Sequence, residues 1–283
     1  MLRIKDIMNR FSVTRLIGKA IIILWVVFTF AAIGWVFLAS LSTTSEIFSD
    51  KVFNSGFHIE NYMRVLSKYN ILIYFKNSFL YTSIACIGAI ILVAPASYVI
   101  ANYAFRGRNL IRSAYITTMG IPGIMLMIPL FMIISKLGLN KTPAALLLIY
   151  ICSTTPFTVF YLIGFFSSLP KSIQEAGLID GCSHIKAFWK VVFPLAQPGL
   201  VTVTIFNFIG LWNEYMWALI FANTKSRRTL ALGLQAMVDG MRYSGDWAGL
   251  FAAVVIVFIP TFIIYIFLSD KIMSGITGGA VKG

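Results

Sequence analysis

The chain has 283 residues, of which 59% are hydrophobic and 12% are charged. A soluble domain carries charge on about a quarter of its residues, because its surface must face water, so this composition excludes an ordinary soluble protein and requires lipid as the outer solvent. The net charge of +13 does not indicate nucleic-acid binding, since the basic residues lie in short connections between apolar runs, where anionic headgroups and basic cytoplasmic loops account for them.

Long charge-free runs predict an all-α, polytopic membrane protein with six transmembrane helices. A helix rises about 1.5 Å per residue, so about 20 apolar residues cross the hydrocarbon core. The windows that lack Asp, Glu, Lys and Arg over such a length are Ala20–Ser45, Asn77–Phe105, Ser113–Ser135, Thr142–Pro170, Val191–Asn213 and Trp247–Ser269. The first window is too long for the apolar region of a cleavable signal peptide, and we expect a retained helix.

Basic residues before the first span and in the loop 106–112 favour cytoplasmic termini. The chain then divides into an N-terminal cytoplasmic segment (1–19), a first helix with an extracytoplasmic loop (20–72), a core (73–269) and a cytoplasmic tail (270–283).

Prolines inside the spans should kink them; they are Pro95, Pro122, Pro129, Pro156 and Pro260. At Pro122 and Pro129, two explanations stay open: a kinked helix that lines a pathway, or a proline that a membrane helix simply tolerates.

The cytoplasmic segment 168–198 is predicted to form helix, break, helix. Pro170 suits a first helical turn, Gly181 should stop the first helix, and Ser183 is a plausible N-cap for the second. The second helix then carries one apolar face, which Pro194 should end; its members are Ile185, Phe188, Trp189 and Val192. Such an apolar face must be buried, either in a groove of a partner protein or at the membrane surface.

The same segment resembles the EAA loop of binding-protein-dependent ABC importer permeases. Glu175-Ala176-Gly177, Gly181 and the run Val191–Pro194 have the spacing of that motif, with Gly177 for Ala, Val191 for Ile and Phe193 for Leu as departures. The resemblance extends to the MalG-like carbohydrate branch through Asn77-Ser78, Phe105–Arg108, Trp212-Asn213-Glu214 and Gly279–Gly283.

This resemblance implies the type I ABC importer permease fold, with 73–269 as the type-1 transmembrane core, in a bacterial inner (plasma) membrane. It implies a permease subunit, not an enzyme, that forms half of the path for a sugar, with an oligosaccharide as the expected class. The implied partners are a heterologous second permease, a cytoplasmic ATPase dimer and an extracytoplasmic solute-binding protein. ATP and Mg would bind to the ATPase, since this chain has no G-x-x-x-x-G-K-[ST] phosphate loop.

In the resemblance, the EAA loop couples the permease to the ATPase. Small residues would let a partner backbone approach closely, and Glu175 would meet a basic group. The coupling residues expected on this basis are Glu175, Ala176, Gly177, Asp180, Gly181, Ile185, Phe188, Trp189 and Pro194.

A candidate substrate path is formed by Trp212, Asn213, Glu214 and Tyr215. A carboxylate in a span is costly and usually functional, and aromatic rings with amide and carboxylate groups suit a sugar. The alternatives are an aromatic anchor at the outer interface or pairing of Glu214 with an arginine of a neighbouring chain.

Two outer segments, Thr43–Lys76 and Ala222–Asp246, are candidates for docking the solute-binding protein or for unspecific solvated connections. The cysteines (Cys86, Cys152, Cys182) and the histidines (His58, His184) are dispersed, so no disulfide framework or metal site is expected. The competing functions are a self-sufficient channel or secondary transporter and a structural or assembly protein, neither of which requires the segment 170–198.

Overall fold

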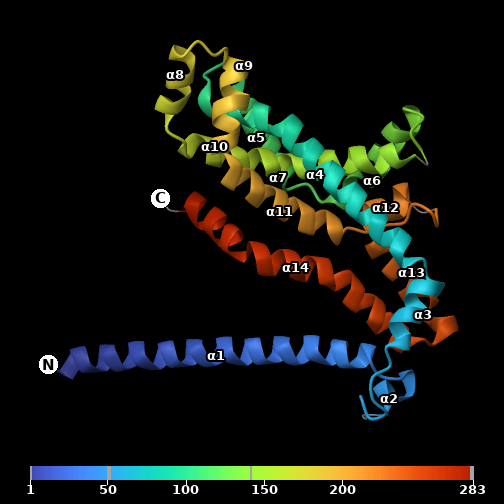
Figure 1. Ribbon diagram of the computed structural model, residues 1–283. Coiled ribbons are helices and arrows are strands. Elements are labelled where there is room, and N and C mark those ends of the chain that lie inside the picture. The colour runs from blue at the N-terminus through green and yellow to red at the C-terminus, as the bar shows by residue number, and fades with distance from the viewer. Residues whose placement is uncertain (1, 50–51, 141, 223, 281–283) are drawn as a thin grey trace. The chain divides into compact units, whose positions relative to one another are not determined.

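The computed structural model describes residues 2–49, 52–140, 142–222 and 224–280, and every regular element in these ranges is a helix (Figure 1). The elements are α1 (Leu2–Ser40), α2 (Thr44–Phe48), α3 (Glu60–Lys68), α4 (Ile71–Asn102), α5 (Arg108–Thr118), α6 (Gly123–Lys136), α7 (Pro143–Ser168), α8 (Lys171–Ile179), α9 (His184–Ala187), the π-helix η1 (Phe188–Val192), α10 (Phe193–Leu195), α11 (Gln197–Trp212), α12 (Met216–Phe221), α13 (Leu230–Ser244) and α14 (Trp247–Ala280).

Within the described residues, four helices are long and apolar enough to cross a membrane, and two further spans are bent pairs. The straight spans are Thr14–Ser40, Ile71–Asn102, Pro143–Ser168 and Trp247–Phe267. Counting each bent pair as one span gives up to six, in agreement with the six apolar windows. α14 continues to Ala280, past the expected end of the last span at Ser269; residues 281–283 of the expected tail lie outside the described residues.

The two bent spans are the third and the fifth windows. α5 and α6 meet at 108°, and the helix that begins at His184 meets α11 at 73°. The first break precedes Pro122, which has no N–H to donate and disfavours helical backbone at the residue before it. This proline therefore breaks its span rather than kinking it, whereas Pro95, Pro129, Pro156 and Pro260 lie inside continuous helices.

The chain forms two compact units, one of Met1–Tyr69 with Met237–Ile256 and one of Asn70–Ala236 with Val257–Gly283. In the second unit, α4 packs along α7, and α11 packs against both. Small residues on α4, such as Ala85, Ala89 and Ala94, are fully buried and permit close approach of the helices.

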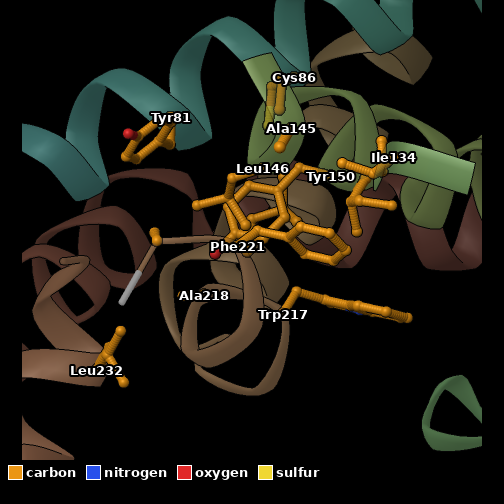
Figure 2. Close-up of a cluster of buried hydrophobic side chains, with 14 residues drawn as sticks. Tyr81, Cys86, Ile134, Ala145, Leu146, Tyr150, Trp217, Ala218, Phe221 and Leu232 are labelled. Atoms are coloured by element: carbon orange, nitrogen blue, oxygen red, sulfur yellow. The ribbon is translucent and has the colours of Figure 1, made fainter. Parts of the chain in front are cut away.

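The core of this second unit has two clusters, one near each end of α4. Figure 2 shows the first, in which Tyr81 and Cys86 of α4 lie near Tyr150 of α7 and Trp217 and Phe221 of α12. The second cluster joins the other end of α4 to α7, η1 and α11; its aromatic members include Tyr98, Phe166 and Phe188. The segment 168–198 therefore rests on a packed helix end.

In the first unit, polar contacts fix the end of α1 and the two short helices after it. Asn61 Nδ2 donates to the carbonyls of Ser40 and Ser42 at 3.0 and 2.9 Å, which satisfies acceptors that a helix end leaves free. Thr43 and Glu46 form a capping box at the start of α2. The amide of Thr43 donates to the Glu46 carboxylate. This hydrogen bond is the main cause that lowers the pKa of Glu46 to about 2.

Candidate functional site

The first helix of the candidate coupling loop stops just before Gly181, as predicted. Gly181 has φ of +80°, a conformation that costs residues with a Cβ about 1–2 kcal/mol. Its amide donates to Leu178 O at 3.1 Å, and that of Cys182 donates to Gly177 O at 3.0 Å. These two bonds make a Schellman motif, which satisfies the last carbonyls of α8. α8 and α9 consequently lie near one another at one end of the α4–α7 pair (Figure 1).

The second helix begins as predicted and ends later than predicted. The Ser183 hydroxyl accepts the amide of Lys186 at 3.4 Å, so Ser183 is the N-cap. Pro194 does not end the helix, because α10 continues to Leu195. Phe193 N–H bonds Phe188 O in the i→i−5 pattern of a π-helix; this wider turn accommodates a residue without an N–H. Pro170 precedes α8 as its N-cap residue instead of lying in the first turn.

The apolar face predicted for the second helix is divided between the chain's own core and the surface. Phe188 and Val192 are 4% and 5% exposed, and Phe188 lies against Tyr98 with ring centroids 5.0 Å apart. Ile185 is 75% exposed and Trp189 is 40% exposed. The expectation that this whole face needs a partner or the membrane surface to cover it was therefore wrong, because the chain's own core already buries Phe188 and Val192.

The remaining coupling residues lie on the surface of α8 and the turn, with one exception. Glu175, Ala176, Asp180 and Gly181 are exposed, and Gly177 is buried. A Cβ on Gly177 would lie 3.5 Å from Val191 Cγ2 and 3.7 Å from the Ala187 Cβ. These are ordinary van der Waals distances. The alanine that the EAA motif has at this position would therefore fit in place of Gly177.

A tyrosine that the sequence did not single out fastens the loop to α4. Tyr103, directly after α4, accepts a hydrogen bond from Gln174 Nε2 at 2.6 Å and lies 3.0 Å from His184 Nδ1. Arg108 donates to the carbonyls of Ile100 and Ala101 at 2.6 and 3.0 Å. The carboxyl end of a helix favours a nearby cation, so these bonds stabilise the end of α4. Local sequence patterns carry no signal for such contacts between distant segments.

The candidate substrate-path residues do not form one exposed group. Trp212 is 1% exposed, donates to Val257 O at 3.2 Å and stacks on Phe208. Glu214 accepts from Tyr150 Oη at 2.9 Å and from the amides of Trp217 and Ala218 at 2.6 and 3.3 Å.

The Glu214 carboxylate thus accepts hydrogen bonds from amides in the first turn of α12. Asn213 and Tyr215 are the exposed members of the set.

Polar contacts also involve the two candidate docking segments or the residues beside them. Asn77 Nδ2 donates to the carbonyls of Ser226 and Arg228 at 2.9 and 3.0 Å, and Ser78 Oγ accepts the amide of Leu230 at 2.7 Å.

In the other unit, Arg64 pairs with Asp246 at 2.9 Å beside a polar pocket that His58, Glu60 and Lys68 also line. The His58–Glu60 contact lowers the pKa of Glu60. Among the described residues, no three His, Cys, Asp or Glu side chains group as metal ligands.

The chain is similar to sugar transport permeases over nearly its whole length. It is 34% identical over 267 residues to the diacetylchitobiose uptake system permease protein NgcG of Streptomyces coelicolor, covering 94% of this chain and 88% of that one. It is 33% identical over 251 residues to the trehalose/maltose transport system permease protein MalG of Thermococcus litoralis, covering 88% and 90%.

A solved structure shares the fold. It is that of a bacterial ABC transporter involved in the import of the acidic polysaccharide alginate; the TM-score is 0.75 at 24% identity, covering 90% of this chain and 96% of the matched chain. A family model matches residues 87–273, which include the candidate coupling loop. The chain therefore belongs to the family described as binding-protein-dependent transport system inner membrane component.

Proposed function

We propose that the chain is one of two different permease subunits of an ATP-driven, binding-protein-dependent importer of sugars, with an oligosaccharide as the expected substrate class. The observation that carries this proposal is its similarity over nearly the full length to permeases of diacetylchitobiose and of trehalose/maltose transport systems. The family is one of components that work with a solute-binding protein and with the ATPase of an ABC importer.

The loop around Gly181 is the surface proposed to receive the ATPase. Ile179 and Ile185 are 85% and 75% exposed on the two sides of a hydrogen-bonded turn, and Glu175 is exposed on the same helix as Ile179. Apolar side chains on short helices suit a groove in a partner, and the carboxylate suits a basic group beside that groove. Phe188 and Val192 support this surface from beneath.

The loop is well placed to pass a displacement into the membrane spans. α8 follows α7 after Leu169 and Pro170, and the helix from His184 to Leu195 continues into α11 after Ala196. α7 and α11 both pack on α4. A push on α8 and α9 would therefore move packed helices, which is the expected route from ATPase closure to alternating access.

The other partners are proposed from the remaining surfaces. α1 contains the apolar span Thr14–Ser40, which suits contact with lipid and with the second permease. The Arg64–Asp246 pair and the polar pocket beside it support docking of the solute-binding protein on the outer segments. The termini would then be cytoplasmic, with the type-1 core at 73–269.

The proposed coupling surface is tested in the assembled transporter. Ile185→Ser should weaken ATPase retention about tenfold or more, because burying an isoleucine contributes about 1.5–3 kcal/mol. Gly181→Asp should lower both retention and ATP-driven uptake, since it places a charged side chain on the turn that faces the proposed partner. Met63→Ser, at a residue that is 66% exposed on α3, is the matched control for ATPase retention.

Retention and ATP-driven uptake at the unsubstituted level in both Ile185→Ser and Gly181→Asp would refute the coupling role of this loop. The readouts are the amount of ATPase that co-purifies in detergent and sugar uptake into vesicles.

A further inference from the structure

We propose that Tyr103 is a positioning residue for energy coupling, whose hydroxyl holds both arms of the loop against the end of α4. This inference rests on the proposed coupling role of the loop. Gln174 lies on α8, before the turn at Gly181, and His184 begins α9, after the turn. The phenol oxygen of Tyr103 is 2.6 Å from Gln174 Nε2 and 3.0 Å from His184 Nδ1.

The chemistry of the three groups assigns a direction to these bonds. An amide nitrogen can only donate, so Gln174 donates to the phenol oxygen. The phenol keeps its own proton, which it can donate to His184 Nδ1 when the ring nitrogen is unprotonated. One hydroxyl thus accepts from one arm and donates to the other, and its removal breaks both links at once.

The residue that carries this hydroxyl is itself fixed to α4. Its ring makes an edge contact with Tyr98, with centroids 5.8 Å apart, and its amide donates to Val99 O at 3.0 Å. Arg108 donates hydrogen bonds to the carbonyls of Ile100 and Ala101, near the end of α4. Movement of the loop is therefore passed to α4, the helix on which α7 and α11 both pack.

The hydroxyl acts in addition to an apolar anchor, which makes its role separable from folding. Phe188 packs on Tyr98 and Phe166, with ring centroids 5.0 and 6.2 Å away, and none of these contacts needs the Tyr103 oxygen. Tyr103→Phe keeps the ring and loses two hydrogen bonds. The loop should stay folded and bind the ATPase, but its position relative to α4 should be less defined.

The test measures sugar transported per ATP hydrolysed in the reconstituted complex. Tyr103→Phe should lower this ratio about two- to tenfold, the range expected for a net hydrogen bond, while ATPase retention is unchanged. Gln174→Leu breaks one of the same bonds from the other side and should give a loss of the same kind. Tyr265→Phe, at a tyrosine that is 61% exposed on α14, is the control and should have no effect.

A double-mutant comparison separates positioning from general damage. Because Tyr103→Phe already breaks the bond to Gln174, adding Gln174→Leu should cause little further loss. An unchanged ratio in Tyr103→Phe and Gln174→Leu, or two losses that multiply independently, would overturn the inference. If Ile185→Ser and Gly181→Asp weaken ATPase retention while Tyr103→Phe has no effect, only the role of Tyr103 fails; if they do not, the coupling surface itself fails.

Discussion

The two glycines of the candidate coupling loop should respond in opposite ways to the same substitution. Gly181 has φ of +80°, and a Cβ there would meet nothing within 4 Å. The cost of Gly181→Ala is therefore a backbone cost alone, about 1–2 kcal/mol for a left-handed alanine. Gly177 is helical, and its Cβ would lie at ordinary contact distance from Val191 and Ala187. Alanine is favoured over glycine inside a helix by about 0.8–1.0 kcal/mol, so Gly177→Ala should stabilise α8.

Hydrogen exchange of the Cys182 amide reports on this turn directly, because that amide donates to Gly177 O at 3.0 Å. Where local opening limits exchange, Gly181→Ala should speed exchange of this amide by a factor of about 5 to 30. Gly177→Ala should slow it by a smaller factor. Exchange that is unchanged in Gly181→Ala, or faster in Gly177→Ala than in the unsubstituted chain, would refute the assignment of the turn.

Three further outcomes are expected. Gly199→Ala should lower the free energy of unfolding by about 1–3 kcal/mol, because its Cβ would lie 2.5 Å from ring carbons of Phe165. The control is Gly210→Ala in the same helix, where a Cβ would meet nothing within 4 Å. This substitution should not lower the melting temperature. The pKa of Glu46 is lowered from 4.5 to about 2, so its contribution to the stability of α2 should be complete above pH 4.5 and lost as the pH falls to about 2. Pepsin cleavage at α2 should rise over that interval, and a rise of equal size in Glu46→Gln would contradict this. Glu214→Gln should lower the melting temperature, since the loss of part of its hydrogen bonding costs about 1–3 kcal/mol. It should leave sugar selectivity unchanged. Altered selectivity at unchanged stability would instead support contact between Glu214 and the substrate.

The sequence was sufficient for the features that depend on local composition. Charge-free length identified the apolar windows, because a span must exclude ionised groups over about 20 residues. The helix end at Gly181 and the N-cap at Ser183 were also predictable, since each depends on the backbone or hydroxyl of a single residue.

Features that depend on contacts between distant segments were not predictable. The spacing of Phe188 and Val192 matched that of Ile185. Of these three residues only Ile185 is exposed, because the other two belong to the buried cluster that includes Tyr98 and Phe166. Pro194 alone predicted a helix end, whereas the π-helical turn before it lets the helix continue.

The contacts of Tyr103 and Glu214 could not be predicted for the same reason. Tyr103 bonds residues more than seventy positions away, at Gln174 and His184. Glu214 was singled out as a costly carboxylate in a span, and the groups that satisfy it include Tyr150, on a helix sixty-four positions earlier. A single sequence shows that such a carboxylate needs partners but does not show which ones.

The most direct test of the central claim is reconstitution of the transporter with and without its partners. A tagged form of this chain should co-purify with a cytoplasmic ATPase and a second, different permease. Vesicles that contain the complex should take up sugar only with ATP and the solute-binding protein. If the chain purifies alone and vesicles that contain only this chain transport sugar without ATP, it is a self-sufficient transporter and the coupling role of the loop is contradicted.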